Sequence, residues 1–292
     1  MMDKIVVLIA SPGSRGLAGI EDAAWQRSEF SEFRWLSPDE ACELLPRAEP
    51  VVFAKRLKDA MAGQPIDIAV LPAEGRRKRL LVADMDSTMI DQESIDELAA
   101  VAGVGERVAA ITERAMRGEL DFEAALRERL ALLARLPITH VHQLVKATRF
   151  TSGGRTLVQT MKAHGAFTML VSGGFVPFTS HVAAVLGFDE HRANELIAEN
   201  GVLSGRAGEP ILGRHAKAEA LKDIKGRLGL HDHETLAVGD GANDREMITA
   251  AGLGVAFHAK PILRESADVQ IDHGDLTALL YLQGYRKNEF VA

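Results

Sequence analysis

Short apolar runs alternate with amphipathic stretches along most of the chain. Beyond residue 79 this pattern predicts strands at 80–84, 167–171, 194–198, 235–239, 253–257 and 268–271. Most of these strands are separated by helical stretches, which favours a mainly parallel, doubly wound sheet. The run LLVA at 80–83 is apolar throughout, as in strands that are buried on both faces. The pattern therefore predicts an α/β core.

One interval breaks this alternation. Residues 85–166 separate the first two strands of the core, and they contain the helical patterns IDELAAVAG, ERVAAITERAMRG, DFEAALRERLALLARL and ITHVHQLVKA. The interval is too long for a simple crossover between parallel strands. We expect an inserted helical subdomain at about 88–155, where it can act as a lid.

The first part of the chain has an α/β pattern of its own. The apolar runs KIVVLIA, FRWL and IDIAVL predict three strands, and helices are predicted around 16–29 and 38–62. The polar segment PAEGRRKR at 72–79 then interrupts the apolar pattern, as a linker does. We place the boundary at about residue 76, which gives units of residues 1–76 and 77–292.

Composition narrows the classes of protein. The 292 residues can bury a sizeable core, and 47% hydrophobic with 26% charged residues is typical of soluble globular proteins. No apolar run approaches the roughly 18 residues of a membrane span, and the run of about six residues near the start is too short for a signal peptide. We therefore expect no membrane partner.

Cysteine and charge add two expectations. The single cysteine, Cys42, rules out an intrachain disulfide and a multi-cysteine metal site, which fits a cytoplasmic location. The net charge is −7, and the only basic cluster, RRKR at 76–79, is short and lacks interleaved aromatic residues. Nucleic-acid binding is therefore not expected.

Polar clusters follow three of the predicted strands. DMDST at 84–88, SGG at 172–174 and GDGAND at 239–244 each come after an apolar run. In a doubly wound sheet ligands bind beyond the carboxyl ends of the strands, so these clusters can converge. Lys217, at the start of an amphipathic helix, joins them. Each motif alone is common in turns, caps or solvated helices, but their order and positions together favour a site.

The residue types in these clusters predict phosphoryl transfer. Asp84 is ionised at neutral pH and can attack phosphorus without a base, giving an aspartyl phosphate. Asp86 would protonate the leaving oxygen and later deprotonate water. Asp84, Asp240 and the backbone carbonyl of Asp86 are hard oxygen ligands of the kind that Mg²⁺ prefers, and Asp244 can support them from behind.

The remaining polar groups suit the phosphoryl oxygens. Ser172, Lys217 and the backbone amides of Gly173 and Gly174 would bind these oxygens and the charge that spreads over them in transfer. The glycines allow a close approach of the backbone.

The order DMDST, SGG, lysine and GDGAND resembles the haloacid-dehalogenase-like phosphatases, and DMDST with the helical insert is similar to the phosphoserine phosphatases among them. The resemblance covers roughly residues 78–285. It implies a Rossmann-like core with a helical cap, dependence on Mg²⁺, and a small-molecule substrate, O-phospho-L-serine, that is hydrolysed to serine and phosphate. A homodimer is compatible with the sequence.

The resemblance also implies a role for each matching residue. In the core it makes Asp84 the nucleophile, Asp86 the acid and base, Ser172 and Lys217 phosphate ligands, Asp240 a metal ligand, and Asn243 and Asp244 neighbours of the metal or the phosphate. In the cap it assigns Glu93 to the substrate ammonium and Arg129 to the substrate carboxylate, with Met116 and Phe122 beside them and backbone contacts from Gly173.

The N-terminal unit resembles the corresponding region of this family less closely than the phosphatase unit does. In many bacterial relatives this region is an amino-acid-binding ACT domain of order βαββαβ, whereas three strands are predicted here. The resemblance therefore implies an ACT-like or degenerate unit. SPGSRG at 11–16 lacks the GxxxxGK[ST] pattern of a phosphate-binding loop.

Arg129 occupies an unusual position. It lies on the apolar stripe of its predicted helix, with Phe122, Leu126 and Leu133 at the other stripe positions. A guanidinium there can extend to solvent from the edge of the stripe, pair with a structural carboxylate, or face the site and bind a substrate carboxylate.

Two other functions remain open. The motifs do not reveal the phosphoryl acceptor, so a phosphotransferase acting on homoserine, or a phosphatase for another small phosphomonoester, would share them. A non-enzymatic amino-acid-binding regulator would need a vestigial site, and the intact pair Asp84 and Asp86 weighs against it.

Overall fold

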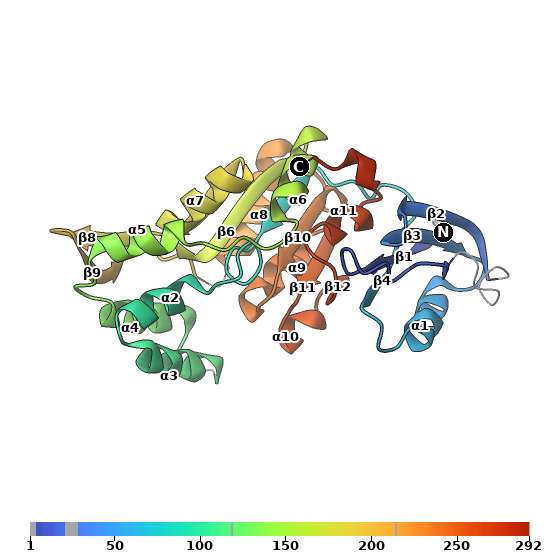
Figure 1. The fold of residues 1–292 in the computed structure, drawn as a ribbon. Coiled ribbons are helices and arrows are strands. Elements are labelled where there is room, and N and C mark those ends of the chain that lie inside the picture. Colours follow the sequence, from blue (N-terminus) through green and yellow to red (C-terminus); the bar gives the residue numbers. More distant parts are fainter. Residues whose placement is uncertain (1–3, 21–28, 118, 214, 292) are drawn as a thin grey trace.

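Three parts of the molecule lie in a row in the computed structural model, which describes residues 4–20, 29–117, 119–213 and 215–291. The α/β core is in the middle, the N-terminal sheet lies at one end and a helical cap lies at the other (Figure 1). The cap and the N-terminal sheet therefore contact different ends of the core.

The core is built on a six-stranded sheet of order β12-β11-β10-β5-β6-β7. All of its neighbouring strands pair in parallel, which confirms the doubly wound prediction. The strand order reverses beside β5, because the chain first builds β6 and β7 on one side and then β10, β11 and β12 on the other. Such a reversal opens a crevice for ligands at the carboxyl ends of the strands. The strands are β5 (Leu80–Ala83), β6 (Phe167–Phe175), β7 (Glu190–Asn194), β10 (Thr235–Gly239), β11 (Leu253–Phe257) and β12 (Val269–Ile271).

Helices cover both faces of this sheet. Leu80 and Val82 of β5 pack with α8, α9 and α10 on one face, whereas Leu81 and Ala83 pack with α6, α7 and α11 on the other. This alternation explains why LLVA is apolar at every position. The core helices are α6 (Gly154–Ala163), α7 (Val176–Leu186), α8 (Ala216–Leu228), α9 (Arg245–Ala250), α10 (Pro261–Arg264) and α11 (Ala278–Leu282), with short 3-10 turns η2 (Asp232–Glu234), η3 (Ala242–Asp244) and η4 (Lys287–Glu289).

The strand predicted at 194–198 is wrong in its position. The sheet strand is β7, which ends at Asn194, and the next segment is β8 (Leu196–Glu199), which forms an antiparallel hairpin with β9 (Val202–Ala207). β7 is an edge strand with the polar sequence EHRAN, whereas LIA in β8 is apolar. The apolar pattern therefore indicated the hairpin instead of the sheet strand.

The cap consists of four helices inserted between β5 and β6, as the sequence predicts: α2 (Ser94–Val101), α3 (Gly105–Met116), α4 (Phe122–Leu132) and α5 (Ile138–Lys146). The β8–β9 hairpin, which the sequence did not predict, pairs with the α4–α5 loop. The backbone N–H of Arg135 donates to the Leu203 carbonyl at 2.8 Å, and that of Ile138 donates to the Gly201 carbonyl at 3.0 Å. A later segment of the core chain thus completes the cap.

The N-terminal unit is a four-stranded antiparallel sheet of order β2-β3-β1-β4, with one described helix. The prediction of three strands is therefore wrong, because ACELLP in the predicted helix 38–62 forms a strand. Its residues have no strong strand signal, but they pair with β1, and such pairing overrides local propensity. Of the predicted helix 16–29, residues 16–19 form turns and residues 21–28 lie outside the described chain. The elements are β1 (Lys4–Ala10), β2 (Phe30–Ser37), β3 (Ala41–Pro46), α1 (Pro50–Ala60) and β4 (Ile66–Pro72).

The N-terminal sheet is packed against the core. Val6 and Leu8 of β1 face α1, whereas Ile5, Val7 and Ile9 belong to the main core cluster. Each basic residue of RRKR has a partner in another segment: Arg76 pairs with Glu43, Arg77 with Glu289, Lys78 donates to the His233 carbonyl, and Arg79 pairs with Glu234. In the part of the chain that the structure describes, no helix is long and apolar enough to cross a membrane.

Candidate active site

The three predicted strand ends and Lys217 do converge. DMDST follows β5, SGG ends β6, GDGAND joins β10 to η3, and Lys217 lies in the first turn of α8. A cavity of about 860 Å³ lies between this edge of the sheet and the cap. Its walls include Asp84, Asp86, Ser172 and Asp240 from the core and Glu93, Phe122 and Arg129 from the cap. The fold therefore brings together groups from both parts.

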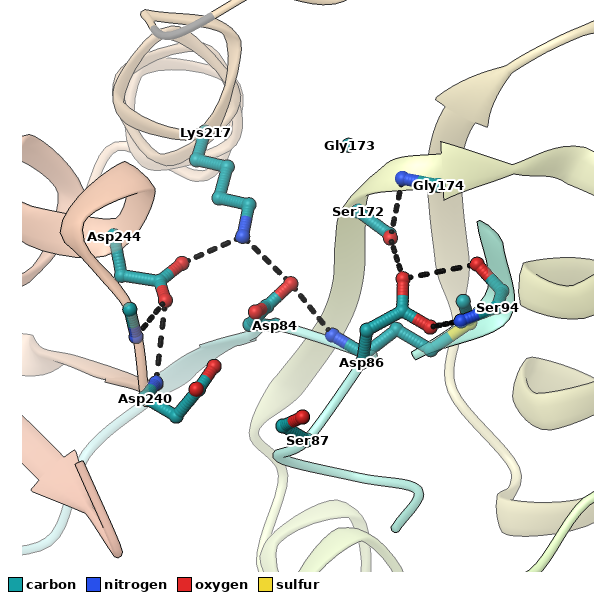
Figure 2. Close-up of polar contacts among 12 residues, drawn as sticks. Asp84, Asp86, Ser87, Ser94, Ser172, Gly173, Gly174, Lys217, Asp240 and Asp244 are labelled. Carbon is teal, nitrogen blue, oxygen red and sulfur yellow. Dashed lines mark hydrogen bonds and ion pairs between the residues drawn. The ribbon is translucent and has the colours of Figure 1, made fainter. Parts of the chain in front are cut away.

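Lys217 lies between two buried carboxylates. Its Nζ is 2.6 Å from Asp84 Oδ1 and 2.6 Å from Asp244 Oδ1, and Figure 2 shows the ammonium between them. Burial alone would lower the pKa of Lys217, but the attraction of Asp244 and Asp84 outweighs it and raises that pKa above its ordinary value. Asp84 and Asp244 therefore favour the cationic form of Lys217.

Asp84 is the buried carboxylate at the end of β5. Its Oδ1 also accepts the backbone N–H of Met85 at 2.8 Å. Burial and the nearby Asp244 raise the pKa of Asp84, and Lys217 opposes them. A further cation at this carboxylate would favour its ionised form.

The donor set suits a hard divalent cation. Asp84, Asp240 and Asp244 each offer a carboxylate oxygen, and these three oxygens lie within 4.8 Å of one another. Both oxygens of Asp244 already accept from protein donors: Oδ1 from Lys217, and Oδ2 from the backbone N–H groups of Asp240 at 3.2 Å and Gly241 at 3.0 Å. Asp84 and Asp240 are therefore the better metal ligands, and Asp244 fits a supporting position.

Asp86 is held by three side-chain and backbone donors. Its Oδ1 accepts the Ser94 N–H at 2.9 Å, and its Oδ2 accepts the hydroxyls of Ser94 and Ser172, each at 3.2 Å (Figure 2). Burial, with a smaller effect of Glu93, raises the pKa of Asp86 to about 7. A carboxyl with such a pKa can both give and take a proton near neutral pH.

The SGG motif packs closely around Asp86. A methyl group at Gly174 would lie 2.7 Å from Asp86 Oδ2, so a larger residue would displace the carboxylate. The Gly174 N–H was expected to face a phosphate, but it donates to Ser172 Oγ at 2.8 Å. The Gly173 carbonyl accepts from Asn194 Nδ2 at 2.9 Å. In this structure the SGG motif therefore holds the Ser172 hydroxyl in place through the Gly174 N–H, so that this amide does not face the cavity as a phosphate donor.

The cap contributes two oppositely charged groups. Glu93 precedes α2, and its Oε1 accepts the Ser87 hydroxyl at 2.8 Å. Arg129 of α4 is half-buried at the cavity wall, and its Nε donates to the Ala125 carbonyl at 3.2 Å. Burial lowers the pKa of Arg129, and Asp96 and Glu93 oppose that effect. Among the described residues, no carboxylate forms an ion pair with Arg129.

Three further predicted residues are Phe122, Asn243 and Met116, and the structure describes the side chains of the first two. The ring of Phe122 lies against Gly173, where an added methyl group would be 3.0 Å from Phe122 Cζ. Asn243 lines the same cavity. Met116 ends α3, but its side chain lies outside the described part of the chain.

Sequence reasoning missed two residues, Ser94 and Lys260. Ser94 follows Glu93 and donates twice to Asp86. Lys260 follows β11, and its Nζ lies 3.3 Å from Asp240 Oδ2 and 3.9 Å from Glu93 Oε1. Burial lowers the pKa of Lys260, but Asp240 and Glu93 raise it above its ordinary value. HAK after LGVAF is a fourth polar strand end, and that signal could have identified Lys260.

The fold and the strand-end site define a family. The model of the haloacid dehalogenase-like hydrolase family matches residues 81–249. The chain therefore belongs to the haloacid dehalogenase-like hydrolases. A solved structure of a hydrolase of this family from Salmonella enterica serovar Typhi superposes with a TM-score of 0.83 at 29% identity, and the match covers 96% of this chain and 97% of the other.

Two further similarities concern phosphoserine phosphatases. The phosphoserine phosphatase of Mycobacterium tuberculosis is 44% identical over 238 residues, which are 81% of this chain and 58% of that protein. A solved phospho-aspartyl intermediate analogue of phosphoserine phosphatase has a TM-score of 0.66 and 42% identity, over 70% of this chain and 98% of the other. The chain spans 58% to 66% of the length of the first curated relatives that it matches.

Proposed function

We propose that this chain is a phosphoserine phosphatase that uses Mg²⁺ to hydrolyse O-phospho-L-serine to serine and phosphate. The observation that carries the proposal is one cavity with Asp84 and Asp86 on its core side and Glu93 and Arg129 on its cap side. The substrate has a phosphate, an ammonium and a carboxylate, and each has a complementary group in that cavity. The similarity to phosphoserine phosphatases supports the same substrate.

In the first step, Asp84 attacks phosphorus and the bond from phosphorus to the serine oxygen breaks. Asp86 gives its proton to that oxygen, so serine leaves as a neutral alcohol and Asp84 carries the phosphoryl group. In the second step, water attacks phosphorus and Asp86 takes a proton from it. Phosphate leaves, and both carboxyl groups return to their first state.

Mg²⁺ would be held by Asp84, Asp240 and the backbone carbonyl of Asp86, with Asp244 behind them. When bound, it offsets negative charge on the phosphoryl oxygens. Asp244 orients its neighbours by accepting two N–H groups and the Lys217 ammonium. These hydrogen bonds would hold the metal-binding residues in position before the metal binds.

Lys217, Ser172, Asn243 and the backbone of Gly173 would bind the phosphoryl oxygens. The buried Lys217 is the strongest of these groups, because its charge lies 2.6 Å from the attacking carboxylate in a site of low dielectric. Ser172 is held by Gly174, and its hydroxyl lies 3.2 Å from Asp86.

Recognition of the amino acid falls to the cap. Arg129 lines the cavity, its Nε donates to the Ala125 carbonyl, and it has no ion-pair partner among the described residues, so its charge is available to the substrate carboxylate. Glu93 would accept from the substrate ammonium, and Phe122 and Met116 would pack beside the carbon chain. Substrate choice therefore depends on residues that carry out no bond chemistry.

We divide the chain into an ACT-like unit of residues 1–76 and a phosphatase unit of residues 77–292, with the cap at about 88–155. The antiparallel sheet with α1 supports the first unit, and the insertion between β5 and β6 supports the cap. We place the enzyme in the cytoplasm because its single cysteine, Cys42, is a buried thiol, and cell fractionation would test that location.

A phosphate-release screen tests the function. O-phospho-L-serine should be the best substrate, ahead of its D enantiomer, of O-phosphoethanolamine, which lacks the carboxylate, and of 3-phosphonooxypropanoate, which lacks the ammonium. Activity should disappear on exhaustive chelation and return with Mg²⁺. Full activity after chelation, or a clear preference for an ester without the amino-acid groups, would contradict the proposal.

The same assay separates hydrolysis from transfer. With homoserine present, a hydrolase should still release one phosphate for each serine that it forms. Serine release in excess of phosphate, with O-phosphohomoserine as a product, would show a phosphotransferase.

A further inference from the structure

Lys260 contacts two carboxylates that have different roles in the proposed function. Its Nζ is 3.3 Å from Asp240 Oδ2, in the candidate metal site, and 3.9 Å from Glu93 Oε1, in the candidate ammonium site. Lys260 itself lines the cavity, and 58% of its side chain is exposed. One exposed lysine is thus shared by the two carboxylates that would bind the divalent cation and the substrate ammonium.

Among the described residues, neither of the other two cations that we place in the site forms an ion pair with these carboxylates. Lys217 is buried between Asp84 and Asp244, and Arg129 belongs to the cap helix α4 and forms no ion pair with a described carboxylate. Asp240 and Glu93 therefore have Lys260 as their shared counter-charge. Without it, Glu93 would keep the Ser87 hydroxyl and the more distant charge of Arg129, and Asp240 would have no ion-pair partner among the described residues.

The main chain of Lys260 is fixed, so a change of partner involves the side chain alone. Its backbone N–H donates to the Asp240 carbonyl at 2.9 Å, and Pro261, which begins α10, follows it. The four-carbon side chain can turn from Asp240 towards Glu93 or solvent about this fixed point. The fold thus places a movable charge at a constant position.

We propose that Lys260 is a positioning residue that couples the metal site to the ammonium site, because it competes with the divalent cation at Asp240 and with the substrate ammonium at Glu93. The inference deepens the proposed function and rests on it for the identity of the substrate. Lys260 pairs with Asp240 until the divalent cation displaces it there, and with Glu93 until the substrate ammonium displaces it there. It touches no atom that reacts.

The inference predicts that loss of the Lys260 charge tightens the binding of both the divalent cation and the substrate ammonium. Lys260→Met keeps an unbranched side chain but removes a positive charge that repels a divalent cation at Asp240. We expect this variant to bind Mn²⁺ about 10-fold more tightly, which corresponds to about 1.4 kcal/mol. Lys260→Arg should bind Mn²⁺ as the parent does.

The ammonium site should respond in the same direction. The ratio of kcat/KM for phosphoserine to that for 3-phosphonooxypropanoate should rise several-fold in Lys260→Met, because Glu93 becomes free for the ammonium. The change should lie in KM, since Lys260 does not touch the reacting atoms. A loss of general phosphate attraction would affect both substrates alike and cancel in the ratio.

Titration of the full chain with Mn²⁺ alone, followed by electron paramagnetic resonance, tests the metal half without any substrate. Lys55→Met, which removes an exposed lysine from α1, is the charge-matched control and should leave the affinity unchanged. Tighter binding in Lys260→Met with parental affinity in Lys260→Arg and Lys55→Met supports the inference. Unchanged or weaker binding in Lys260→Met overturns it.

Two further measurements keep the test decisive. Lys260→Gln must show the same tightening, so that misfolding of one variant cannot decide the result, and the melting temperature of each variant is recorded. If the parent fails to hydrolyse phosphoserine, the proposed function fails, whereas the Mn²⁺ titration still decides the competition at Asp240.

Discussion

The core carries an added unit at each end, and the two contacts are built in opposite ways. The cap meets the core around a cavity of about 860 Å³ whose walls carry carboxylates and a guanidinium. The N-terminal sheet meets it through Ile5, Val7 and Ile9, which belong to the main core cluster, and through Arg76. Arg76 pairs with Glu43, both at most 8% exposed, and donates to the Leu282 carbonyl of the core at 3.3 Å. The contact with the cap leaves its polar groups facing the cavity, whereas the contact with the N-terminal sheet buries its polar groups.

Two acids show the same contrast. Both oxygens of Asp67, on β4, accept backbone N–H groups from residues 272–274, and the shortest of these bonds is the 2.7 Å bond from Gly274. Asp86 also accepts hydrogen bonds, but it faces the cavity and its pKa is raised to about 7. A strand-end acid surrounded by N–H groups fastens two segments, whereas one that faces a cavity can exchange protons.

The largest effect is expected at Asp84. Asp84→Asn should lower turnover by about 10⁴-fold or more, because no other group is placed to form the phosphoenzyme. In the parent, trapped phosphate should be stable in acid, sensitive to hydroxylamine and located on Asp84 by mass mapping. Asp91→Asn, an exposed acid of the same loop, is the control and should be nearly normal. A phosphoryl group on Ser87 or Ser172 would refute the assignment.

Asp86→Asn should lower turnover of phosphoserine by about 10² to 10⁴-fold, because the leaving oxygen loses its acid. In single-turnover phosphorylation, a substrate with a good leaving group, such as p-nitrophenyl phosphate, should lose less. The variant should keep its metal affinity, since the metal contact is assigned to the backbone. Equal losses for both substrates would argue against the acid role.

At the opposite end of the core, Glu43→Gln should affect stability instead of chemistry. It leaves Arg76 buried without its charged partner, which typically costs about 3 to 5 kcal/mol in the free energy of unfolding. Urea unfolding would measure this loss, and kcat of the folded fraction should not change. Arg15→Gln breaks an exposed pair with Asp39 in the same unit and should cost about 0 to 1 kcal/mol. Similar stability losses in both variants would show that the enclosed pair of Arg76 and Glu43 contributes no more than an exposed pair.

Arg129→Ala should weaken kcat/KM for phosphoserine by about 10- to 100-fold, as expected for hydrogen bonds to a charged group. O-phosphoethanolamine, which lacks the carboxylate, should be hydrolysed nearly as well as by the parent. Arg127→Ala is the matched control, because Arg127 is exposed on the same helix and pairs with Glu209. If both substrates lose activity equally at an unchanged melting temperature, Arg129 does not bind the carboxylate.

Removal of residues 1–76 should leave turnover nearly unchanged, because every residue with a proposed chemical role lies beyond them. The shortened chain should be less stable, since it loses the apolar cover that Ile5, Val7 and Ile9 provide. Phosphate release and thermal unfolding would be measured together. A folded fragment without activity would show that the N-terminal unit takes part in the site.

The sequence predicted the parallel core, the helical insertion and the strand-end clusters, because each depends on a contiguous pattern. It misplaced β7 and missed β3, whose strand character comes from pairing with distant partners. It also interpreted RRKR as a linker on composition alone. Arg77 and Glu289 are 212 positions apart, so nothing near RRKR in the sequence indicates its partners.

The sequence by itself determined which chemical groups the protein has and that they follow buried strands, since DMDST, SGG and GDGAND are local motifs at the ends of apolar runs. Only the tertiary structure decided the partner of each charge. It placed Lys217 between Asp84 and Asp244, set Lys260 between Asp240 and Glu93, and enclosed Arg76 with Glu43. The physical reason is that charge interactions depend on distance in space and on burial, and sequence separation fixes neither.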